Sequence, residues 1–210
     1  MTDRQGPARI DSRISADHLR RQFTEVAVGP DVVEEGEPTR RIPAAVLMPL
    51  VDRAGELSVL LTRRTEHLHD HPGQIAFPGG RREPSDQSSI MTALRETEEE
   101  IGLARKHVEV LGELPRYHTG TGFEVTPVVA LVSPPFELTR DPFEVAEVFE
   151  VPFDFLLDPA NHRRHRLEIR GSMREFWAMP FGDYFIWGAT AGMLVSLYRF
   201  LGTGQDVTAP

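Results

Sequence analysis

The chain has 210 residues, a formal net charge of −9 at pH 7 and no cysteine. That length suffices for one well-buried domain with appendages. The acidic balance argues against general affinity for nucleic acid, because such binding depends on neutralising phosphates. The lack of cysteine excludes disulfides and thiol chemistry. No apolar run approaches the roughly 18 residues of a membrane span, and residues 1–10 lack a signal-peptide core. We therefore expect a cytoplasmic protein without a nucleic-acid or membrane partner.

The N-terminal part of the chain is expected to lie outside the main domain. Residues 15–27 can form a helix with one apolar face. That face consists of Ile14, Leu19 and Phe23. Residues 29–41 are rich in Gly, Pro and Glu, which is typical of a linker. We therefore assign residues 1–41 to an N-terminal extension and linker.

The globular pattern begins at Ile42. Apolar runs at 44–51 and 57–62, joined by a turn at 52–55, predict a β-hairpin. The polar residues 63–72 that follow predict a loop. Further strands are expected at 74–77, 107–114, 123–132, 166–170 and 174–179, with a loop at 115–122.

The C-terminal half completes a mixed pattern of strands and helices. Residues 141–150 fit either a strand or the start of a helix, because periodicity alone does not decide between them. A short helix is expected at 152–157 and a closing helix at 189–201. Together these elements predict an α/β fold over residues 42–202, with a mixed β-sheet packed between helices. Residues 203–210 are expected to form a flexible tail.

An unusually acidic helix follows the expected strand at 74–77 and the turn made by Gly79 and Gly80. Ser85 or Asp86 is the expected N-cap, because a short side-chain oxygen can accept a hydrogen bond from a free backbone amide. Gly102 is the expected stop. The apolar stripe of this helix consists of Ile90, Leu94, Thr97 and Ile101.

Three carboxylates, those of Glu96, Glu99 and Glu100, cluster on another face of this helix within one turn. Like charges at this spacing repel, costing roughly 0.2–0.5 kcal/mol per pair. A divalent cation such as Mg²⁺, which binds oxygen ligands, would give the arrangement a purpose. The alternative is a solvated acidic face. The preceding strand and Gly-Gly turn favour a site, because a solvated surface helix needs neither.

These residues resemble the signature of the Nudix hydrolases. That signature runs Gly, five residues, Glu, seven residues, Arg-Glu, an apolar residue, any residue, Glu-Glu, any residue, Gly and an apolar residue. Residues 95–103, Arg-Glu-Thr-Glu-Glu-Glu-Ile-Gly-Leu, match its second half. The first half departs, because six residues beyond Gly80 lies Asp86 rather than Glu, and eight residues separate Asp86 from Arg95.

A second resemblance is to the coenzyme A pyrophosphatase branch of these enzymes. It rests on the upstream motif formed by Leu60–Thr65, Leu68, His71, Gly73–Gln74 and Phe77–Gly80, and on residues 122–128 and 184–192. The resemblance implies a Nudix-type α/β/α sandwich with Mg²⁺ or Mn²⁺ as cofactor. It implies cleavage of coenzyme A or a derivative into 3′,5′-ADP and a 4′-phosphopantetheine product, and a homodimer is possible. The alternatives are ADP-ribose, NADH or another dinucleotide as substrate, and a non-catalytic module that binds a nucleotide.

The resemblance also assigns roles to the acidic helix. Glu96 and Glu100, four residues apart, are the expected metal ligands, and Glu99 is a third ligand or the base that activates water. Arg95 is expected to orient a glutamate through a salt bridge, with simple surface pairing as the alternative. Glu144, far downstream, is a second candidate for the catalytic base, with a solvent-facing acid as the alternative.

Several upstream residues are candidates for binding the substrate. Arg63 and Arg64 can meet phosphate oxygens through their guanidinium groups, with surface charge as the alternative. His71 and Gln74 belong to the upstream motif and are further candidates. The alternating His67, His69 and His71 suggest zinc, but the missing cysteines and fourth ligand argue against it. Trp177 and Trp187 are expected in the core, with packing on an adenine as the alternative.

Overall fold

Two long central strands organise the fold. The computed structural model describes residues 14–34, 41–68, 70–169 and 172–202. Strand β2 (Ile42–Arg53) and strand β3 (Glu56–Arg64) form the predicted hairpin, although both are longer than the sequence pattern indicates. Alternate residues of β2 enter different cores: Leu47 packs toward one face of the sheet and Met48 toward the other. Burial on both faces explains why β2 has a nearly continuous apolar sequence.

The hairpin belongs to a mixed sheet of nine strands, counted over the described residues, in which β2 pairs with β8 in parallel and with β3 antiparallel. The main path runs β1-β7-β8-β2-β3-β4, while β5 also pairs with β2, β6 with β8 and β9 with β3. The remaining strands are β1 (Val32–Val33), β4 (Ile75–Ala76), β5 (Gly79–Arg81), β6 (Val108–Glu113), β7 (Tyr117–His118), β8 (Phe123–Val132) and β9 (Val145–Pro152).

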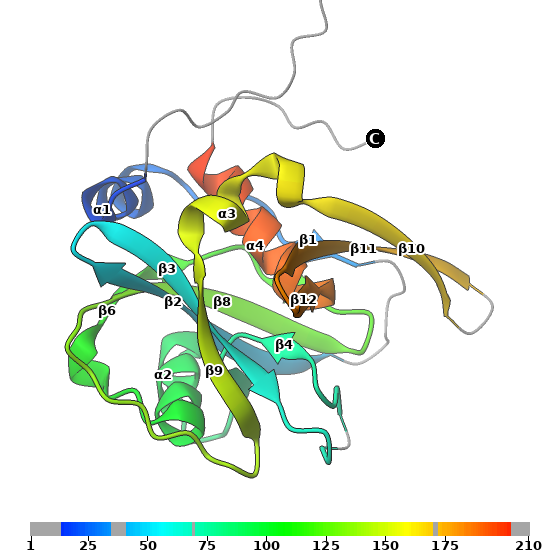
Figure 1. Ribbon diagram of the computed structural model, residues 1–210, viewed down its shortest axis with the longest axis horizontal. Coiled ribbons are helices and arrows are strands. Elements are labelled where there is room, and N and C mark those ends of the chain that lie inside the picture. Colours follow the sequence, from blue (N-terminus) through cyan, green and yellow to red (C-terminus); the bar gives the residue numbers. More distant parts are fainter. Residues whose placement is uncertain (1–13, 35–40, 69, 170–171, 203–210) are drawn as a thin grey trace, which may run out of the picture.

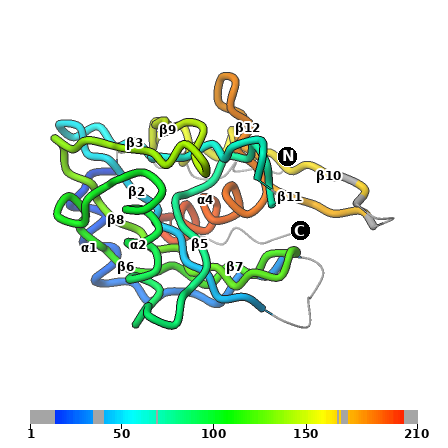
Figure 2. The backbone as a smooth tube through the Cα atoms, turned by 90° about the horizontal axis from the view of Figure 1, so that it is seen from below, coloured from blue at the N-terminus to red at the C-terminus, as the bar shows by residue number. Residues whose placement is uncertain are grey.

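Helices cover both faces of this sheet. Helix α2 (Ser89–Ile101) lies on one face, and α1 (Ala16–Glu25), α3 (Phe153–Leu157) and α4 (Gly188–Leu201) lie on the other (Figure 1). The tube view from below shows α2 beside β5 (Figure 2), which it contacts. Short 3-10 turns occupy Arg105–His107 and Pro159–Asn161. The predicted α/β/α sandwich with a mixed sheet is therefore confirmed.

A smaller antiparallel sheet packs on α4. It consists of β10 (Arg163–Ile169), β11 (Ser172–Phe181) and β12 (Tyr184–Trp187). Met179 and Ile186 are fully buried between this sheet and the main core. The β10–β11 hairpin, whose existence the sequence predicts, extends away from the body of the molecule (Figure 1).

Some predicted elements are corrected by the structure. The expected linker contains β1, which pairs in parallel with β7, a strand inside the expected loop at 115–122. Two-residue strands have no periodicity to detect, because distant backbone groups create them. Arg63 and Arg64, expected in a loop, belong to β3. Gly79 and Gly80, expected in a turn, belong to β5, because their backbones pair with Val46 and Ala45 of β2. Residues 141–150 resolve into a turn followed by the strand β9. The expected tail at 203–210 lies outside the described residues.

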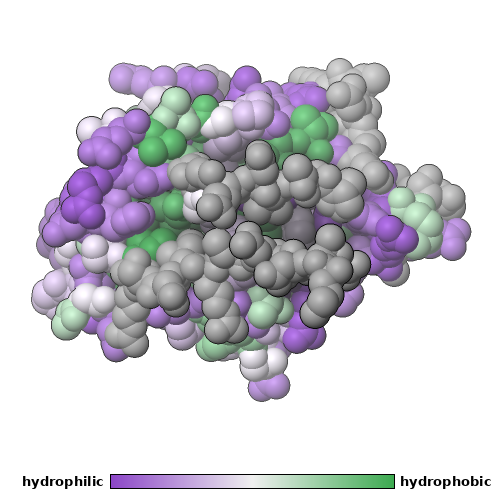
Figure 3. Space-filling model, turned by 90° about the horizontal axis from the view of Figure 1, so that it is seen from above, coloured by the Kyte–Doolittle hydropathy of each residue, from purple (hydrophilic) through white to green (hydrophobic). Residues whose placement is uncertain are grey.

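Helix α1 packs closely on the sheet, as its apolar face predicts. Ser15 caps it by accepting a hydrogen bond from the His18 amide at 3.2 Å. Leu19 is fully buried, and the ring of Phe23 lies 4.6 Å from that of Phe200. Viewed from above, the described surface is largely hydrophilic with small apolar patches (Figure 3). Within the described ranges, no helix has the length and apolarity to cross a membrane.

Candidate active site

Helix α2 presents its acidic residues beside Gly79 and Gly80, the first two residues of β5. Its N-cap is Ser88, whose Oγ accepts a hydrogen bond from the Met91 amide at 3.2 Å, so the expected cap at Ser85 or Asp86 is wrong. Gly102 ends the helix in the left-handed conformation, at φ 69°, as predicted. Thr92, Ala93, Thr97 and Ile101 are buried toward the sheet.

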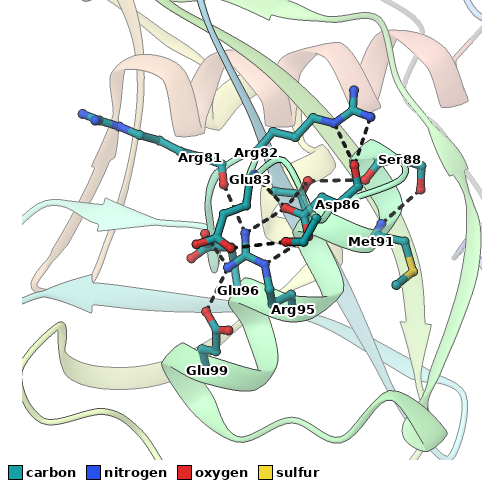
Figure 4. Close-up of polar contacts among 11 residues, drawn as sticks. Arg81, Arg82, Glu83, Asp86, Ser88, Met91, Arg95, Glu96 and Glu99 are labelled. Atoms are coloured by element: carbon teal, nitrogen blue, oxygen red, sulfur yellow. Dashed lines mark hydrogen bonds and ion pairs between the residues drawn. The ribbon is translucent and has the colours of Figure 1, made fainter.

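Asp86 binds Arg95 instead of capping the helix. The Arg95 Nε donates to Asp86 Oδ1 at 3.1 Å, and Nη2 donates to Oδ2 at 2.9 Å (Figure 4). Asp86 Oδ2 also accepts from the Glu83 amide at 2.9 Å and from Thr92 Oγ1 at 3.0 Å. The Arg95 guanidinium holds the pKa of this carboxyl, which is only 5% exposed, well below its usual range. Asp86 is therefore a firmly ionised anchor for Arg95.

Arg95 connects this anchor to two glutamates of the same helix. Its Nη1 lies 3.0 Å from Glu96 Oε1 and 2.9 Å from Glu99 Oε2. Its Nη2 also donates to the Arg81 carbonyl at 3.2 Å, which fixes the guanidinium against β5. Figure 4 shows the guanidinium among these three carboxylates. This geometry agrees with the orienting role expected for Arg95, which we propose below.

The side chains of Glu96 and Glu100 also contact the two glycines of β5. The Gly79 amide donates to Glu100 Oε2 at 3.1 Å. The Glu96 carboxylate lies against the α-carbon of Gly80, where a Cβ would meet its Cδ at 2.5 Å. Only a residue without a side chain leaves room for Glu96 in this position. The two glycines therefore let the Glu96 and Glu100 side chains lie directly against β5.

Burial changes the charge behaviour of this pair. Glu100 is 6% exposed, and burial raises its pKa to about 8. The Gly79 amide and the Arg64 charge oppose this rise, while the negative charges of Glu144 and Glu96 add to it. Burial likewise raises the pKa of Glu96. Both carboxyls are therefore hard to ionise without a cation beside them.

A divalent cation beside this pair would stabilise its ionised form. Mg²⁺ is usually bound through one or two carboxylates and keeps several waters. Glu96 and Glu100 supply two such carboxylates, whereas Glu99 is 59% exposed and paired with Arg95. No set of three His, Asp or Glu side chains in the described parts of the chain is arranged to hold an ion. The pair fits a hydrated hard cation, and the described histidines do not form a zinc site.

Glu144 lies on a loop that hydrogen bonds fasten to the end of α2 and to Thr65, the residue after β3. The Asp141 amide donates to the Glu100 carbonyl at 2.8 Å, which fastens the loop to the end of α2. The Thr65 amide donates to the Glu144 carbonyl at 3.0 Å, and Thr65 Oγ1 donates to the Phe143 carbonyl at 2.7 Å. These contacts place Glu144 beside the acidic pair, although it is 44 residues beyond Glu100 in sequence.

A β-bulge separates the two upstream arginines. The register of β3 and β9 shifts between Arg63 and Arg64, and Arg64 pairs with Val145 next to Glu144. Within the described residues, the buried Nε of Arg64 has no hydrogen-bond partner. Arg63 instead pairs with Glu147 at 3.0 Å. The structure therefore brings Arg64, but not Arg63, to the acidic cluster.

His71 and Gln74 shape the loop that follows Arg64. His71 adopts φ 56°, and its carbonyl accepts a hydrogen bond from the Gln74 amide at 3.3 Å. The Gln74 carbonyl in turn accepts from the Arg64 amide at 2.9 Å. Both residues therefore fasten the loop to β3 through the backbone. The His71 side chain is exposed and that of Gln74 is half-buried.

An α/β/α sandwich in which a helix carries Arg-Glu and Glu-Glu beside a pair of glycines defines a hydrolase of the Nudix class. Residues 41–170 match the NUDIX domain family. The chain belongs to this family of pyrophosphohydrolases. Nudix hydrolases generally use divalent cations such as Mg²⁺ or Mn²⁺ and bind small nucleotide-type substrates.

Relatives match most of the chain. An uncharacterized Nudix hydrolase NudL of Citrobacter koseri is 43% identical over 169 residues, covering 80% of this chain and 86% of its own. The NudL of Salmonella heidelberg is 40% identical over 195 residues, covering 91% and 97%. The crystal structure of the M. smegmatis Nudix hydrolase RenU is 22% identical, with a TM-score of 0.53 over 85% of this chain and 98% of its own. This last likeness concerns the fold alone.

Proposed function

We propose that this enzyme hydrolyses the pyrophosphate bond of coenzyme A or its derivatives, giving 3′,5′-ADP and 4′-phosphopantetheine or its acylated form. The resemblance of residues 60–80 to the coenzyme A pyrophosphatase branch supports this substrate. The observation that carries the proposal is Arg64, whose buried Nε lacks a partner beside the acidic pair. A guanidinium held there suits phosphate oxygens, which it can bind through two parallel hydrogen bonds.

In this proposal Glu96 and Glu100 hold Mg²⁺ or Mn²⁺, and Glu99 is available as a third ligand. The bound ion would neutralise pyrophosphate oxygens and lower the pKa of a water molecule. Arg95 acts as a positioning residue, because its Nη1 lies 3.0 Å from Glu96 Oε1 while Asp86 fixes its other edge. The Gly79 amide holds Glu100 in place.

Two carboxylates are candidates for the base that takes a proton from water. Glu144 lies beside Glu96 and Glu100, whose pKa values its charge raises. Glu99 accepts a hydrogen bond from Arg95 at 2.9 Å. Replacing each by glutamine separates them, because the base supplies roughly 10²–10⁴-fold of the rate. The variant with the larger loss of kcat at saturating metal identifies the base.

The remaining upstream candidates occupy outer positions in this proposal. Arg63 pairs with Glu147, and the bulge separates it from Arg64. In this proposal Arg63 would contact only parts of the substrate outside the pyrophosphate. His71 and Gln74 hold the loop after Arg64, so we assign them a role in keeping the substrate-binding loop in place.

The test is product formation from coenzyme A with and without Mg²⁺ or Mn²⁺, beside ADP-ribose and NADH under the same conditions. We expect metal-dependent release of 3′,5′-ADP, with kcat/KM clearly highest for coenzyme A. A higher kcat/KM for ADP-ribose or NADH would overturn the substrate and leave the Nudix chemistry intact. Turnover of none of the three would favour a module that binds a nucleotide without cleaving it.

A further inference from the structure

We infer that Phe143, together with His67, forms a stacking platform for the adenine ring of the substrate. This inference rests on the proposed function and deepens it, because it names the residues that recognise the nucleotide half. It also assigns a direction to the bound substrate, with adenosine toward Phe143 and the pantetheine chain leaving on the other side of the pyrophosphate.

The first observation is an aromatic ring that the fold leaves uncovered. Phe143 is 64% exposed, the highest value among the large hydrophobic residues described as exposed. Its ring lies 4.6 Å from that of His67, at an interplanar angle of 56°. The exposed histidine therefore supports the phenyl ring without covering it. An isolated exposed apolar residue is ordinary. The location of Phe143 beside the acidic site is therefore what indicates a binding role.

The second observation is that Phe143 adjoins the acidic site on a fixed backbone. The Phe143 carbonyl accepts the Thr65 hydroxyl at 2.7 Å, and its amide donates to Asp141 Oδ1 at 2.8 Å. Asp141 binds the Glu100 carbonyl at 2.8 Å through its own amide. The next residue along the chain is Glu144. The ring is thus presented at the edge of the pyrophosphate site by a loop that three hydrogen bonds hold in place.

His67 reaches the same place from the segment that follows β3. It lies three residues after Arg64, in the turn beyond the end of that strand. The Thr65 amide, between them, binds the Glu144 carbonyl at 3.0 Å. The ring pair therefore joins the loop after β3 to the loop before β9, the two segments that also carry Arg64 and Glu144.

The chemistry of the substrate favours adenine as the occupant. Coenzyme A contains one flat aromatic ring, separated from the pyrophosphate by a single ribose, and a flexible pantetheine chain on the other side. A nucleobase stacks on an aromatic side chain, whereas a flexible chain gains no such planar contact. The other aromatic candidates are less open, because Arg164 lies 4.2 Å over the ring of Trp177, and Trp187 packs on Phe176 and Phe185.

The decisive variants are Phe143→Leu and Phe143→Trp, with Phe185→Leu as the matched control. Phe185 is another exposed phenylalanine, but it belongs to the small sheet. Dissociation constants for 3′,5′-ADP and for 4′-phosphopantetheine are measured by calorimetry in the presence of Mg²⁺. We expect Phe143→Leu to weaken 3′,5′-ADP about tenfold or more, while its affinity for 4′-phosphopantetheine stays unchanged. Phe143→Trp should retain 3′,5′-ADP binding and show tryptophan quenching when it binds.

Three results would overturn the platform. They are unchanged 3′,5′-ADP affinity in Phe143→Leu, equal weakening of both products, and absence of 3′,5′-ADP binding by the wild-type protein. These outcomes do not depend on turnover. If the wild-type protein binds 3′,5′-ADP through Phe143 but does not cleave coenzyme A, the platform stands and the proposed reaction fails. If it cleaves coenzyme A and Phe143→Leu changes neither KM nor affinity, the proposed reaction stands and the platform fails.

Discussion

The Glu96 carboxylate lies directly against the α-carbon of Gly80, so that a Cβ there would stand 2.6 Å from both carboxylate oxygens. Gly79, its neighbour, is enclosed differently. A Cβ at Gly79 would lie 2.4 Å from the Ala45 carbonyl oxygen and 2.5 Å from the Val46 Cα, and its φ is 153°. One glycine therefore makes room for a mobile side chain, and the other for the backbone of β2.

Alanine substitutions should separate these two roles. Gly80→Ala displaces the flexible end of Glu96, so we expect kcat to fall about tenfold or more with little change in Tm. Gly79→Ala forces a side chain onto the backbone of β2, so we expect a clear loss of stability. Thermal unfolding and steady-state kinetics on both variants check this. A large fall in Tm for Gly80→Ala with full activity would contradict the geometry.

Glu100→Gln should abolish turnover without unfolding the protein. The amide retains the size of Glu100 and can accept from Gly79, but it provides no negative charge for a divalent cation. We expect kcat to fall at least about 100-fold and Mn²⁺ affinity to fall in a calorimetric titration. Glu98→Gln is the matched control, because Glu98 is an exposed neighbour paired with Arg105 at 3.2 Å. Equal losses in both variants would remove Glu100 from the metal site.

The metal-free protein should lose stability as the pH rises from about 4.5 to 8, through Glu100. The folded protein raises the pKa of this group from 4.5 to about 8. In that window the folded state binds the proton that the unfolded state has released, so raising the pH favours unfolding. The contribution is on the order of a few kcal/mol.

Carboxyls with lowered pKa, such as Asp86 and Glu109, act in the opposite direction at lower pH. The informative quantity is therefore the difference between wild-type and Glu100→Gln in urea unfolding at pH 5 and pH 8. The wild-type protein should lose more stability over this range than the variant, and added Mg²⁺ should reduce the difference. Parallel pH profiles without metal would contradict the assignment.

Arg95→Lys should impair both folding and catalysis, because an ammonium cannot make the paired contacts of a guanidinium. Asp86 would lose one of its two hydrogen bonds from residue 95, and Glu96 would lose its positioning partner. We expect a lower Tm and a kcat reduced about tenfold or more. Arg105→Lys, at an exposed pair, should change neither.

A double-mutant cycle with Asp86→Asn tests whether Arg95 and Asp86 act together. Because the two side chains are in direct contact, their effects on stability should be strongly non-additive. Additive effects would show that Arg95 positions Glu96 without the help of Asp86.

The long elements were predictable because their own sequence specifies them. Strands β2, β3 and β8 have apolar runs, and α2 and α4 have helical spacing with a stop at or near Gly102 and Gly202. Strands β1 and β7 were missed, because each has two residues. β1 is formed by its pairing with β7, and β7 by its pairing with β1 and with β8. Pairing between segments that lie far apart in the chain cannot be read from the local sequence of either segment.

The candidate site divides in the same way. Glu96 and Glu100 follow from helical spacing, and the structure places both side chains against the glycines of β5. The cap at Asp86 was wrong because Ser88 has an equally suitable side chain, while the pairing of Asp86 with Arg95 is a tertiary contact. Sequence alone could not rank Arg64 above Arg63 geometrically, because the intervening bulge decides which one faces the acids.

The sequence also gave no signal for the aromatic pair at the edge of the site. Phe143 and His67 are 76 residues apart, and neither lies in a periodic pattern. Trp177 and Trp187, the aromatic residues that the sequence offers for packing on an adenine, are half-buried in the small sheet. The nearest available clue was the position of Phe143 directly before Glu144.

The family match begins at residue 41, but the folded core does not. Leu19 is fully buried, Arg20 binds Glu109 through two hydrogen bonds of 2.9 and 2.7 Å, and Gln22 donates to the Phe200 carbonyl at 2.8 Å. A recombinant protein that begins at residue 41 would uncover apolar surface on the sheet and on α4, and would aggregate more readily. Domain boundaries for expression should therefore be drawn before α1.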